Sequence, residues 1–145
     1  MTVNQISVFV ENRPGAMNEM VKILQEGNVD LRALSLAETE SFGVIRLITD
    51  DPDKTLQILN DNEYICRLTP VLAVEMADKP GALGGILSCI GDAGINMEYV
   101  YAFLAKKEGS AFLVLKVADN EEATRVLTAG GFTPLGQKDL PALFS

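Results

Sequence analysis

The chain has 145 residues, of which 48% are apolar and 22% charged, a composition that predicts a soluble protein with a packed core. Its formal net charge of −8 would repel nucleic-acid phosphates, which argues against nonspecific binding to DNA or RNA. Histidine is absent, which removes the commonest general base and the commonest metal ligand, and no apolar run reaches the ~18 residues of a membrane-spanning helix.

The first half of the chain alternates between the apolar periods of strands and helices. Residues 5–11 alternate apolar and polar side chains, with Ile6, Val8 and Val10 on one face, which predicts a half-buried strand. An amphipathic helix follows and ends near Gly27, with its apolar stripe at Met17, Met20, Val21 and Leu24. The pattern then predicts strands at residues 29–38, 44–49 and 64–68, and a second helix that opens at residues 50–53 and faces inward through Thr55, Ile58 and Leu59.

The second half repeats this order element by element. It predicts a strand at residues 72–76 and a helix that ends at residues 91–94, with an apolar stripe at Leu83, Ile86, Leu87 and Ile90. A hairpin of residues 95–105 and 111–118 follows, then a helix that opens at residues 119–122 and a closing strand at 132–135. The core-facing residues of that last helix are Ala123, Val126 and Leu127.

The repetition extends to the residues themselves. Asn12-Arg13-Pro14-Gly15-Ala16-Met17 returns 66 residues later as Asp78-Lys79-Pro80-Gly81-Ala82-Leu83, and a fixed spacing of this kind indicates two copies of one module. The order strand, helix, strand, strand, helix, strand is the split βαβ arrangement. We therefore expect an α+β fold with two ferredoxin-like βαββαβ sandwiches in tandem, in which each antiparallel sheet carries its helices on one face. The expected domains are residues 1–69 and 70–135, followed by a tail of residues 136–145.

The second hairpin has apolar residues on both faces, because Tyr99, Tyr101 and Phe103 alternate with Val100, Ala102 and Leu104. Strands of this kind are covered on two sides. Either the first domain or the tail covers the outer face, or that face is a subunit interface, where Tyr and Phe are favoured. Modules this small bury little surface alone, so we expect a homodimer.

The loop after each first strand carries a more specific signature. A polar residue, one further residue and Pro-Gly-Ala-Met or Pro-Gly-Ala-Leu lead into an apolar helix, and Gly-Asn-Val-Asp-Leu or Ala-Gly-Ile-Asn-Met stands where the second strand begins. Both signatures occur twice, and the sequence resembles the ACT domain family over nearly its whole length. The resemblance implies small-molecule sensing modules, most often for amino acids, that regulate metabolic enzymes. It places the ligand between the loop of one ACT domain and the second strand of another. Unlike most members, this chain has no catalytic domain attached.

These residue types suit a free amino acid. Gly15 and Gly81 stand where a loop turns into a helix, and the unpaired N–H groups there favour a carboxylate. Side-chain oxygens of Asn12, Asp78, Asp30 and Asn96 can accept from an ammonium group. The residues expected to complete the site and to line the side-chain pocket are Ala16, Met17, Val29, Leu31, Ala82, Leu83, Ile95 and Met97.

Each of these residues also has a purely structural interpretation. Asn12 and Asp78 could cap the helices, and Asp30 and Asn96 could be ordinary turn residues. Pro14, Pro80, Gly15 and Gly81 could serve the turn and the helix start alone. The pairing of Asn12 with Asp30, and of Asp78 with Asn96, suggests that the two sites are not equivalent in affinity or ligand preference.

The function expected is a non-catalytic regulatory protein that binds a small molecule, with an amino acid as the expected ligand, at ACT–ACT interfaces near the Pro-Gly loops. An adaptor without a ligand is the alternative. An acylphosphatase-like hydrolase would need a cationic phosphate cradle, and each loop carries one cation, Arg13 or Lys79. An RNA-binding module would need basic and aromatic residues on its third strand. Neither pattern is present, so we expect no enzyme activity, no nucleic-acid partner and no membrane.

The remaining expectations concern cofactors, partners and location. We expect no cofactor and no metal, and a regulated enzyme or regulator as a possible protein partner. Cys66 and Cys89 stand alone and are expected to be reduced structural thiols. The first residues lack the basic segment of a signal peptide, which favours the cytoplasm.

Overall fold

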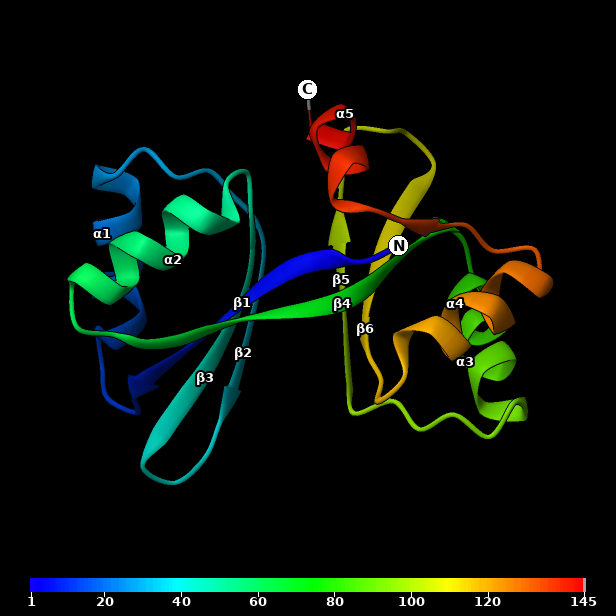
Figure 1. Cartoon of the computed structure of the whole chain (residues 1–145), viewed down its shortest axis with the longest axis horizontal. Coiled ribbons are helices and arrows are strands. Elements are labelled where there is room, and N and C mark those ends of the chain that lie inside the picture. The colour runs from blue at the N-terminus through cyan, green and yellow to red at the C-terminus, as the bar shows by residue number, and fades with distance from the viewer. Residues whose placement is uncertain (145) are drawn as a thin grey trace. The chain divides into compact units, whose positions relative to one another are not determined.

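The computed structural model describes residues 1–144, without the side chain of Leu104. The chain divides into two compact units, each with its own core. The N-terminal unit comprises residues 4–69, and the C-terminal unit comprises residues 1–3 together with the chain from Pro70 onward. Figure 1 shows both units, and each is a sheet covered by two long helices.

The N-terminal unit has the predicted order of elements. These are β1 (Val3–Glu11), α1 (Ala16–Glu26), β2 (Leu31–Glu38), β3 (Phe42–Thr49), α2 (Pro52–Asp61) and the first part of β4 (Ile65–Ala77). The strand order is β2-β3-β1-β4, and β3 pairs antiparallel with both β1 and β2. Helices α1 and α2 cover the same face of this sheet (Figure 1).

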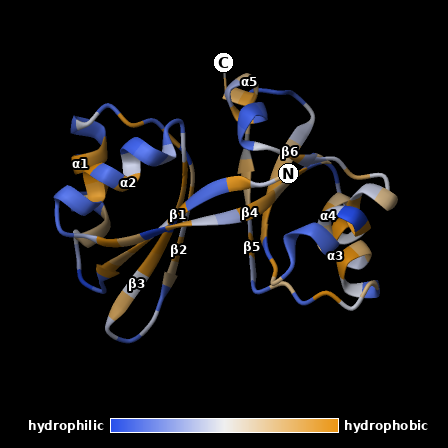
Figure 2. Ribbon diagram, viewed as in Figure 1, coloured by the Kyte–Doolittle hydropathy of each residue, from blue (hydrophilic) through white to orange (hydrophobic). Residues whose placement is uncertain are grey.

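The core of this unit confirms the predicted faces. Ile6 lies opposite Leu47 and Val8 lies opposite Ile45, and all four side chains are buried against the helices. The predicted helix stripe supplies Met20 and Leu24 to the same core, with Met17 and Val21 packed at its margin. Figure 2 shows the apolar residues concentrated along the strands.

The C-terminal unit repeats the architecture with α3 (Ala82–Asp92), β5 (Tyr99–Leu104), β6 (Ser110–Lys116), α4 (Asn120–Ala129) and β7 (Pro134–Leu135). Its strand order is β7-β4-β6-β5, all antiparallel. Helix α1 and helix α3 each have 11 residues, and α2 and α4 each have 10. The fold is therefore α+β with two ferredoxin-like repeats, as the sequence predicts.

The second helix of each unit begins in the same way. Asp51 accepts a hydrogen bond from the Lys54 N–H at 3.1 Å, and Asp119 accepts one from the Glu122 N–H at 3.1 Å. A carboxylate in this position satisfies a backbone donor that the helix leaves unpaired and lies at the positive end of its dipole. The acidic residues that predict these two helix starts therefore act as caps.

Most strand boundaries lie within two residues of the prediction, and three differences are larger or change the connection between strands. The closing strand of the first copy and the opening strand of the second form one continuous strand, β4, which contains Thr69 and Pro70. Strand β5 begins at Tyr99, four residues later than predicted, and the Ile95 N–H donates back to the Ile90 carbonyl at 3.2 Å, which places Ile95 in the turn after α3. Strand β7 has only two residues, and its Pro134 has no N–H to donate to a neighbouring strand.

The tail folds onto the C-terminal unit. A 3₁₀ turn (Gln137–Asp139) leads into the short helix α5 (Leu140–Phe144). The Phe144 ring lies 5.8 Å from the Phe103 ring, which stacks in turn on Phe112 at 5.4 Å, and the Lys106 N–H donates to the Leu143 carbonyl at 3.0 Å. The tail thus covers part of the outer face of the second hairpin, although the side chain of Leu104 lies outside the described residues.

No helix in the described part of the chain has the length and apolar character needed to span a membrane.

Candidate functional site

Both Pro-Gly loops end in a glycine with a left-handed backbone. Gly15 precedes α1 with φ +83°, and Gly81 precedes α3 with φ +89°. A side chain other than glycine would be strained at either position, because its Cβ would crowd the neighbouring carbonyl. Space around a Cβ at either glycine is open within 4 Å, so these helix ends are accessible from outside.

The hydrogen bonds of the two loops match bond for bond. In the first loop the Arg13 N–H donates to the Glu11 carbonyl at 3.0 Å, and the Ala16 N–H donates to the Arg13 carbonyl at 3.3 Å. Lys79 and Ala82 make the corresponding two bonds, at 3.0 and 3.3 Å, in the second loop. The shared sequence therefore builds one loop geometry twice.

Among the described residues, no side chain caps α1 or α3 at Gly15 or Gly81. The Asn12 amide instead donates from Nδ2 to the Thr39 carbonyl at 3.0 Å, which ties the loop to the β2–β3 turn. Capping by Asn12, the structural alternative raised by the sequence, is thus not what the structure shows. N–H groups in the first turn of each helix remain open to an anion.

The two copies differ where their second strands begin. In the N-terminal unit the Asp30 N–H donates to Oδ1 of Asp50 at 3.0 Å, and the Asp30 carboxylate pairs with Arg32 at 2.9 Å. In the C-terminal unit Asn96 lies in an exposed cavity of about 360 Å³. The other residues that line this cavity are Gly94, Ile95, Glu98, Ala118, Asp119 and Glu122. Asp30 is therefore engaged in its own unit, whereas Asn96 faces an acidic cavity.

Within one unit, the predicted site residues form two separate groups. Asn12, Gly15, Ala16 and Met17 lie at the start of α1, whereas residues 29–31 follow its end. A helix of 11 residues is ~16 Å long, so the two groups cannot contact one small ligand. The same separation holds along α3 for the two groups of the second copy, residues 78–83 and 95–97.

Some predicted residues share a cavity and others contribute to the core. Asn12, Ala16 and Met17 line a small cavity of about 80 Å³ together with Val10, Glu11, Arg13, Leu36, Glu38 and Gly43. Val29 is only 9% exposed and belongs to the core. Leu31, Ile95 and Met97 pack at the core margins. By contrast, Leu83 is 43% exposed, although the helical period predicts it to face inward.

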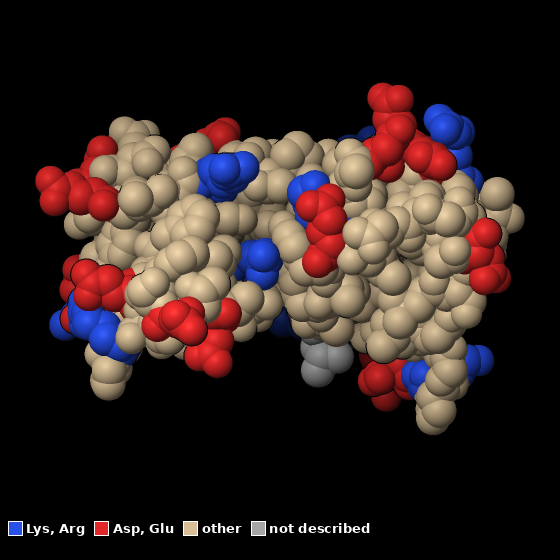
Figure 3. Space-filling view, turned by 90° about the horizontal axis from the view of Figure 1, so that it is seen from below, with Lys and Arg blue, Asp and Glu red and all other residues tan. Residues whose placement is uncertain are grey.

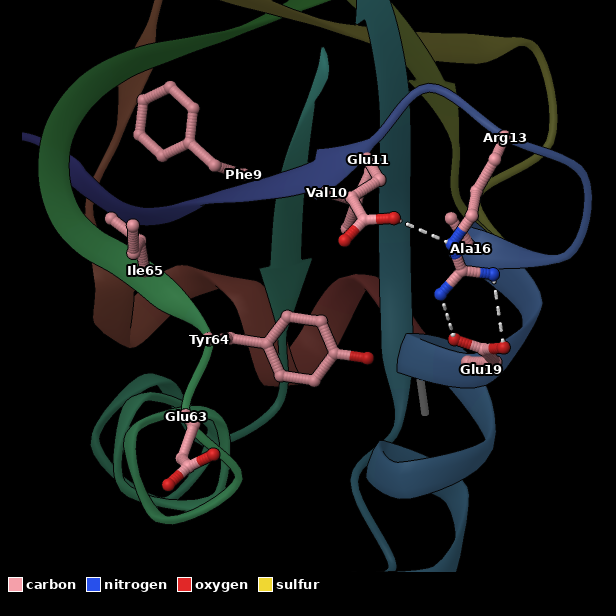
Figure 4. A pocket seen from close by; sticks show the side chains of 9 residues that line it. All are labelled: Phe9, Val10, Glu11, Arg13, Ala16, Glu19, Glu63, Tyr64 and Ile65. Carbon is pink, nitrogen blue, oxygen red and sulfur yellow. Dashed lines mark hydrogen bonds and ion pairs between the residues drawn. The ribbon is translucent and has the colours of Figure 1, made fainter. Parts of the chain in front are cut away.

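A second, larger cavity lies on the other side of the first loop, and the sequence did not assign it. We call it the Arg13 pocket (Figure 4), and its volume is about 230 Å³. Arg13 projects from the loop, Glu19 from the first turn of α1, and Tyr64 from the segment before β4. The full lining is Phe9, Val10, Glu11, Arg13, Ala16, Glu19, Glu63, Tyr64 and Ile65.

Charged hydrogen bonds organise the Arg13 pocket. The guanidinium donates from Nε to Glu11 at 2.8 Å, and from Nη1 and Nη2 to the two oxygens of Glu19 at 3.2 and 2.8 Å. These bonds from Arg13 lower the pKa of Glu19 and raise the pKa of Arg13. Partial burial, and next the charge of Glu19, raise the pKa of Tyr64. A contrast within the repeat could have revealed this cluster, because Ala77 and Gly85 replace Glu11 and Glu19 in the second copy.

Metal binding and thiol chemistry have little support in the described residues. Within residues 1–144 no three Cys, Asp or Glu side chains gather closely enough to hold a metal ion. Cys66 donates to Oδ1 of Asn60 at 3.3 Å, and burial raises the pKa of its thiol. Cys89 donates to the Val126 carbonyl at 3.5 Å. Both are free thiols placed against structural partners.

Charge is distributed rather than concentrated on the surface. On the face drawn in Figure 3, most Lys and Arg side chains stand singly or beside Asp and Glu. A polyanion needs a basic stripe or patch. This face offers none.

The profile of a family described as "ACT domain pair" matches residues 1–143. The chain belongs to this family. This match confirms the resemblance that the two loop signatures indicate. ACT pairs are a family of regulatory domains and not of catalytic ones. No curated protein matches the chain.

Solved structures agree with this assignment. Protein BT0572 from Bacteroides thetaiotaomicron is 32% identical, with a TM-score of 0.88 over 97% of this chain and 96% of that chain. The regulatory subunit of aspartate kinase from Thermus thermophilus is 16% identical, with a TM-score of 0.63 over 88% of this chain and 91% of that one. The corresponding subunit from Thermus flavus is 14% identical, with a TM-score of 0.61 over 88% and 92%. At such low identity the two aspartate kinase subunits show a shared fold.

Proposed function

We propose that this ACT domain pair is a non-catalytic regulatory protein that binds a small molecule, an amino acid, at ACT–ACT interfaces near its Pro-Gly loops. The observation that carries the proposal is the open end of α1 and α3, where a left-handed glycine takes the capping position and no described side chain caps the helix. A ligand carboxylate there would accept from N–H groups and lie at the positive end of the helix dipole. The Thermus thermophilus subunit is described as a ligand-free form, which implies that a ligand exists for that protein.

The second loop is the better carboxylate site of the two. The first turn of α3 carries no acidic residue, whereas Glu19 lies in the first turn of α1. Lys79 forms no ion pair or hydrogen bond through its ammonium within the described residues, and it can attract the carboxylate. Asp78 can accept from the ligand's ammonium group, and the exposed Leu83 can contact its side chain.

The residues that begin the second strands belong to the proposed site through a second module. Since α1 and α3 separate each loop from the strand that follows, a site that combines both groups takes its loop from one ACT domain and Asp30 or Asn96 from another. A homodimer would supply such modules. Light scattering should then give twice the mass of the 15.7 kDa chain, and a monomer would contradict this part of the proposal.

Regulation would act on an enzyme or regulator in the cytoplasm through protein contacts, without nucleic acid or membrane. The alternative is an adaptor that makes the same contacts with empty loops. Its support is the apolar outer face of the second hairpin, where Tyr99 and Tyr101 remain partly exposed.

A thermal-shift series with the twenty amino acids separates the two functions. A ligand that binds only the folded state stabilises it by ~2.7 kcal/mol at 100 times its Kd, which raises Tm by several degrees. We expect one amino acid, or a related group, to do so at millimolar concentration. Absence of any shift would favour the adaptor.

Matched variants locate the site. Lys79→Ala should reduce the shift, whereas Lys22→Ala, which removes the same charge from an exposed position on α1, should leave it unchanged. Calorimetric titration should resolve sites of different affinity, because Asn12 and Asp30 stand in one copy where Asp78 and Asn96 stand in the other. Two identical and independent sites would contradict that difference.

A further inference from the structure

An open apolar hollow lies on the outer face of the N-terminal sheet, the face opposite α1 and α2. We call it the Phe9 hollow, and its volume is about 480 Å³. Phe9 alternates along β1 with the core residues Val8 and Val10, so its side chain points away from the helices. The residues that line the hollow are Phe9, Val10, Glu11, Phe42 and Ile65.

Large apolar side chains at the Phe9 hollow are open to solvent. Phe42 is 40% exposed and Ile65 is 72% exposed. The partly buried Phe9 ring lies beside Phe42, with the ring centroids 5.7 Å apart and the planes tilted by 54°. Single apolar residues on a surface are ordinary, but contiguous apolar patches are where proteins bind ligands or partners.

The second copy of the module shows that the fold does not require this apolar group. The two copies align with an offset of 66 residues up to the hairpin turn and 68 after it, as Asn12 with Asp78 and Asp51 with Asp119 show. At the exposed positions of the hollow the second copy has polar residues. The pairs are Phe9 and Glu75, Phe42 and Ser110, and Ile65 and Thr133.

Polar side chains satisfy one another at the corresponding place in the C-terminal unit. The Glu75 carboxylate accepts a hydrogen bond from the Ser110 hydroxyl at 2.9 Å and pairs with the Lys107 ammonium group. The strand pairing is nevertheless the same, because Phe42 lies opposite the last residue of β1 and Ser110 lies opposite the corresponding residue, Ala77. The apolar residues of the first copy are therefore not dictated by the fold.

The one charged residue that lines the Phe9 hollow is already paired. Oε2 of Glu11 accepts from Nε of Arg13 at 2.8 Å. Figure 4 shows this contact on the side of Glu11 away from Phe9 and Ile65. A charged ligand in the hollow would lose hydration without gaining a partner, so the lining favours an uncharged ligand.

The size of the hollow favours a small molecule over a protein surface. A stable protein interface takes ~20–30 residues from each side, whereas five residues line this hollow, so this contact alone would not hold a second copy of the chain. A volume of about 480 Å³ lies within the ~300–1,000 Å³ of small-molecule sites. The tilted rings of Phe9 and Phe42 suit a third ring, because aromatic rings pair best when they are offset or edge to face.

We propose that the Phe9 hollow binds an uncharged aromatic ring of a small molecule, which packs against Phe9, Phe42 and Ile65. Binding covers the apolar surface that these three side chains leave open. The hollow lies on the outer face of the sheet, whereas the amino-acid site proposed above lies at the helix ends, and neither proposal depends on the other.

Four probes of similar size test the class of ligand on the intact chain. Amide and methyl NMR shifts are followed during titration with benzyl alcohol, cyclohexylmethanol, benzylammonium and benzoate. Benzyl alcohol should give saturable shifts that centre on residues 9, 42 and 65, and the other three should bind roughly threefold to tenfold more weakly. Equal binding of cyclohexylmethanol would show a nonspecific apolar surface, and tighter binding of either ion would show a charged site. Either result would overturn the proposal, as would the absence of saturable shifts with every probe.

Variants that copy the second module locate the ring. Phe42→Ser and Ile65→Thr introduce the residues that the same fold accepts as Ser110 and Thr133, and both positions are exposed, so both variants should fold. Phe42→Ser should weaken benzyl alcohol roughly tenfold, because it removes one of the two rings. Ile65→Thr should weaken it less, by roughly threefold, because it removes only part of an aliphatic side chain. Unchanged binding in both variants would contradict the proposed location.

A matched control removes an exposed apolar side chain elsewhere in the same sheet. Leu34 is 44% exposed but lies opposite the core residue Leu47, on the other face of the sheet. Leu34→Ala should leave the binding of benzyl alcohol unchanged, and equal weakening would show nonspecific adsorption and overturn the proposal.

Light scattering separates the proposed site from a subunit contact. Phe42→Ser should have the same mass in solution as the unchanged protein. A fall to half that mass would show that a second copy covers the hollow, and it would overturn the proposal. Thermal shifts with amino acids report the site at the Pro-Gly loops, so the two proposals can fail separately.

Discussion

Arg13 binds Glu19 through both terminal nitrogens, with Nη1–Oε1 at 3.2 Å and Nη2–Oε2 at 2.8 Å. This paired geometry is the strongest that an arginine and a carboxylate form. It joins the Pro-Gly loop to the first turn of α1, and Nε of Arg13 adds Glu11 from the end of β1. One side chain thus connects the strand, the loop and the helix.

The pKa of Glu19 is the direct readout of this pair. Hydrogen bonds from Arg13 hold the pKa of Glu19 below its ordinary value. A depressed pKa contributes stability that is fully present above the unfolded value of ~4.3 and is lost as the pH falls through the folded value. Arg13→Gln should raise the pKa of Glu19 toward normal in a carboxyl NMR titration. Lys22→Gln should not, and an unchanged pKa in Arg13→Gln would contradict the pairing. Both groups are largely exposed, so salt should weaken the effect.

Glu63→Gly should stabilise the protein, because Glu63 has a left-handed backbone. Glycine relieves the left-handed strain but gives the unfolded chain more freedom, and the net gain should be ~0.5–1 kcal/mol in the free energy of unfolding. Urea denaturation measures it. The reverse change, Gly131→Glu, should destabilise the protein by a similar ~0.5–1 kcal/mol. A loss of stability in Glu63→Gly would mean that Glu63 has a structural role.

A buried pair of hydroxyls connects β3 to α2. Oγ1 of Thr49 lies 2.9 Å from Oγ1 of Thr55, and Thr55 also donates to the Asp51 carbonyl at 2.8 Å. Thr55→Ala leaves the buried Thr49 hydroxyl without this partner and should cost about 1–3 kcal/mol. The double variant Thr49→Val/Thr55→Ala copies Val117 and Ala123 of the second unit, where both are buried. It should therefore cost less than the sum of the two single changes, and strict additivity in a double-mutant cycle would refute the coupling.

Phe144 anchors the tail to the second hairpin. Its ring lies 5.8 Å from that of Phe103, beside the hydrogen bond from the Lys106 N–H to the Leu143 carbonyl. Phe144→Ala removes most of this contact, so the Lys106 amide should exchange with solvent about tenfold faster or more. Ala142→Ser, at an exposed position of α5, is the control. Unchanged exchange in Phe144→Ala would show that the tail is held by other contacts.

The local pattern of apolar residues predicted most of the fold, and the repeat supported each predicted helix and strand with a counterpart in the other copy. The alternation of Ile6, Val8 and Val10 identified the buried face of β1 because side chains alternate between the two sides of a strand. The helical period placed Met20 and Leu24 correctly, but it placed Leu83 inward, where the structure leaves it exposed. Periodicity reports which residues share a face, and only packing decides how far the covered area extends.

The candidate site divides in the same way. The sequence by itself determined where the two Pro-Gly loops lie and that each leads into a helix. Both features depend only on neighbouring residues, such as the glycine before each helix. Only the tertiary structure brought Arg13 and Glu19 to Glu63 and Tyr64, because β4 lies beside β1 in the sheet and returns residues some 50 positions later to the same loop. Tertiary structure alone also separated the loops from Asp30 and Asn96 by the length of a helix. Short-range geometry follows from the chain's own periods, whereas contacts between distant segments depend on which strands pair.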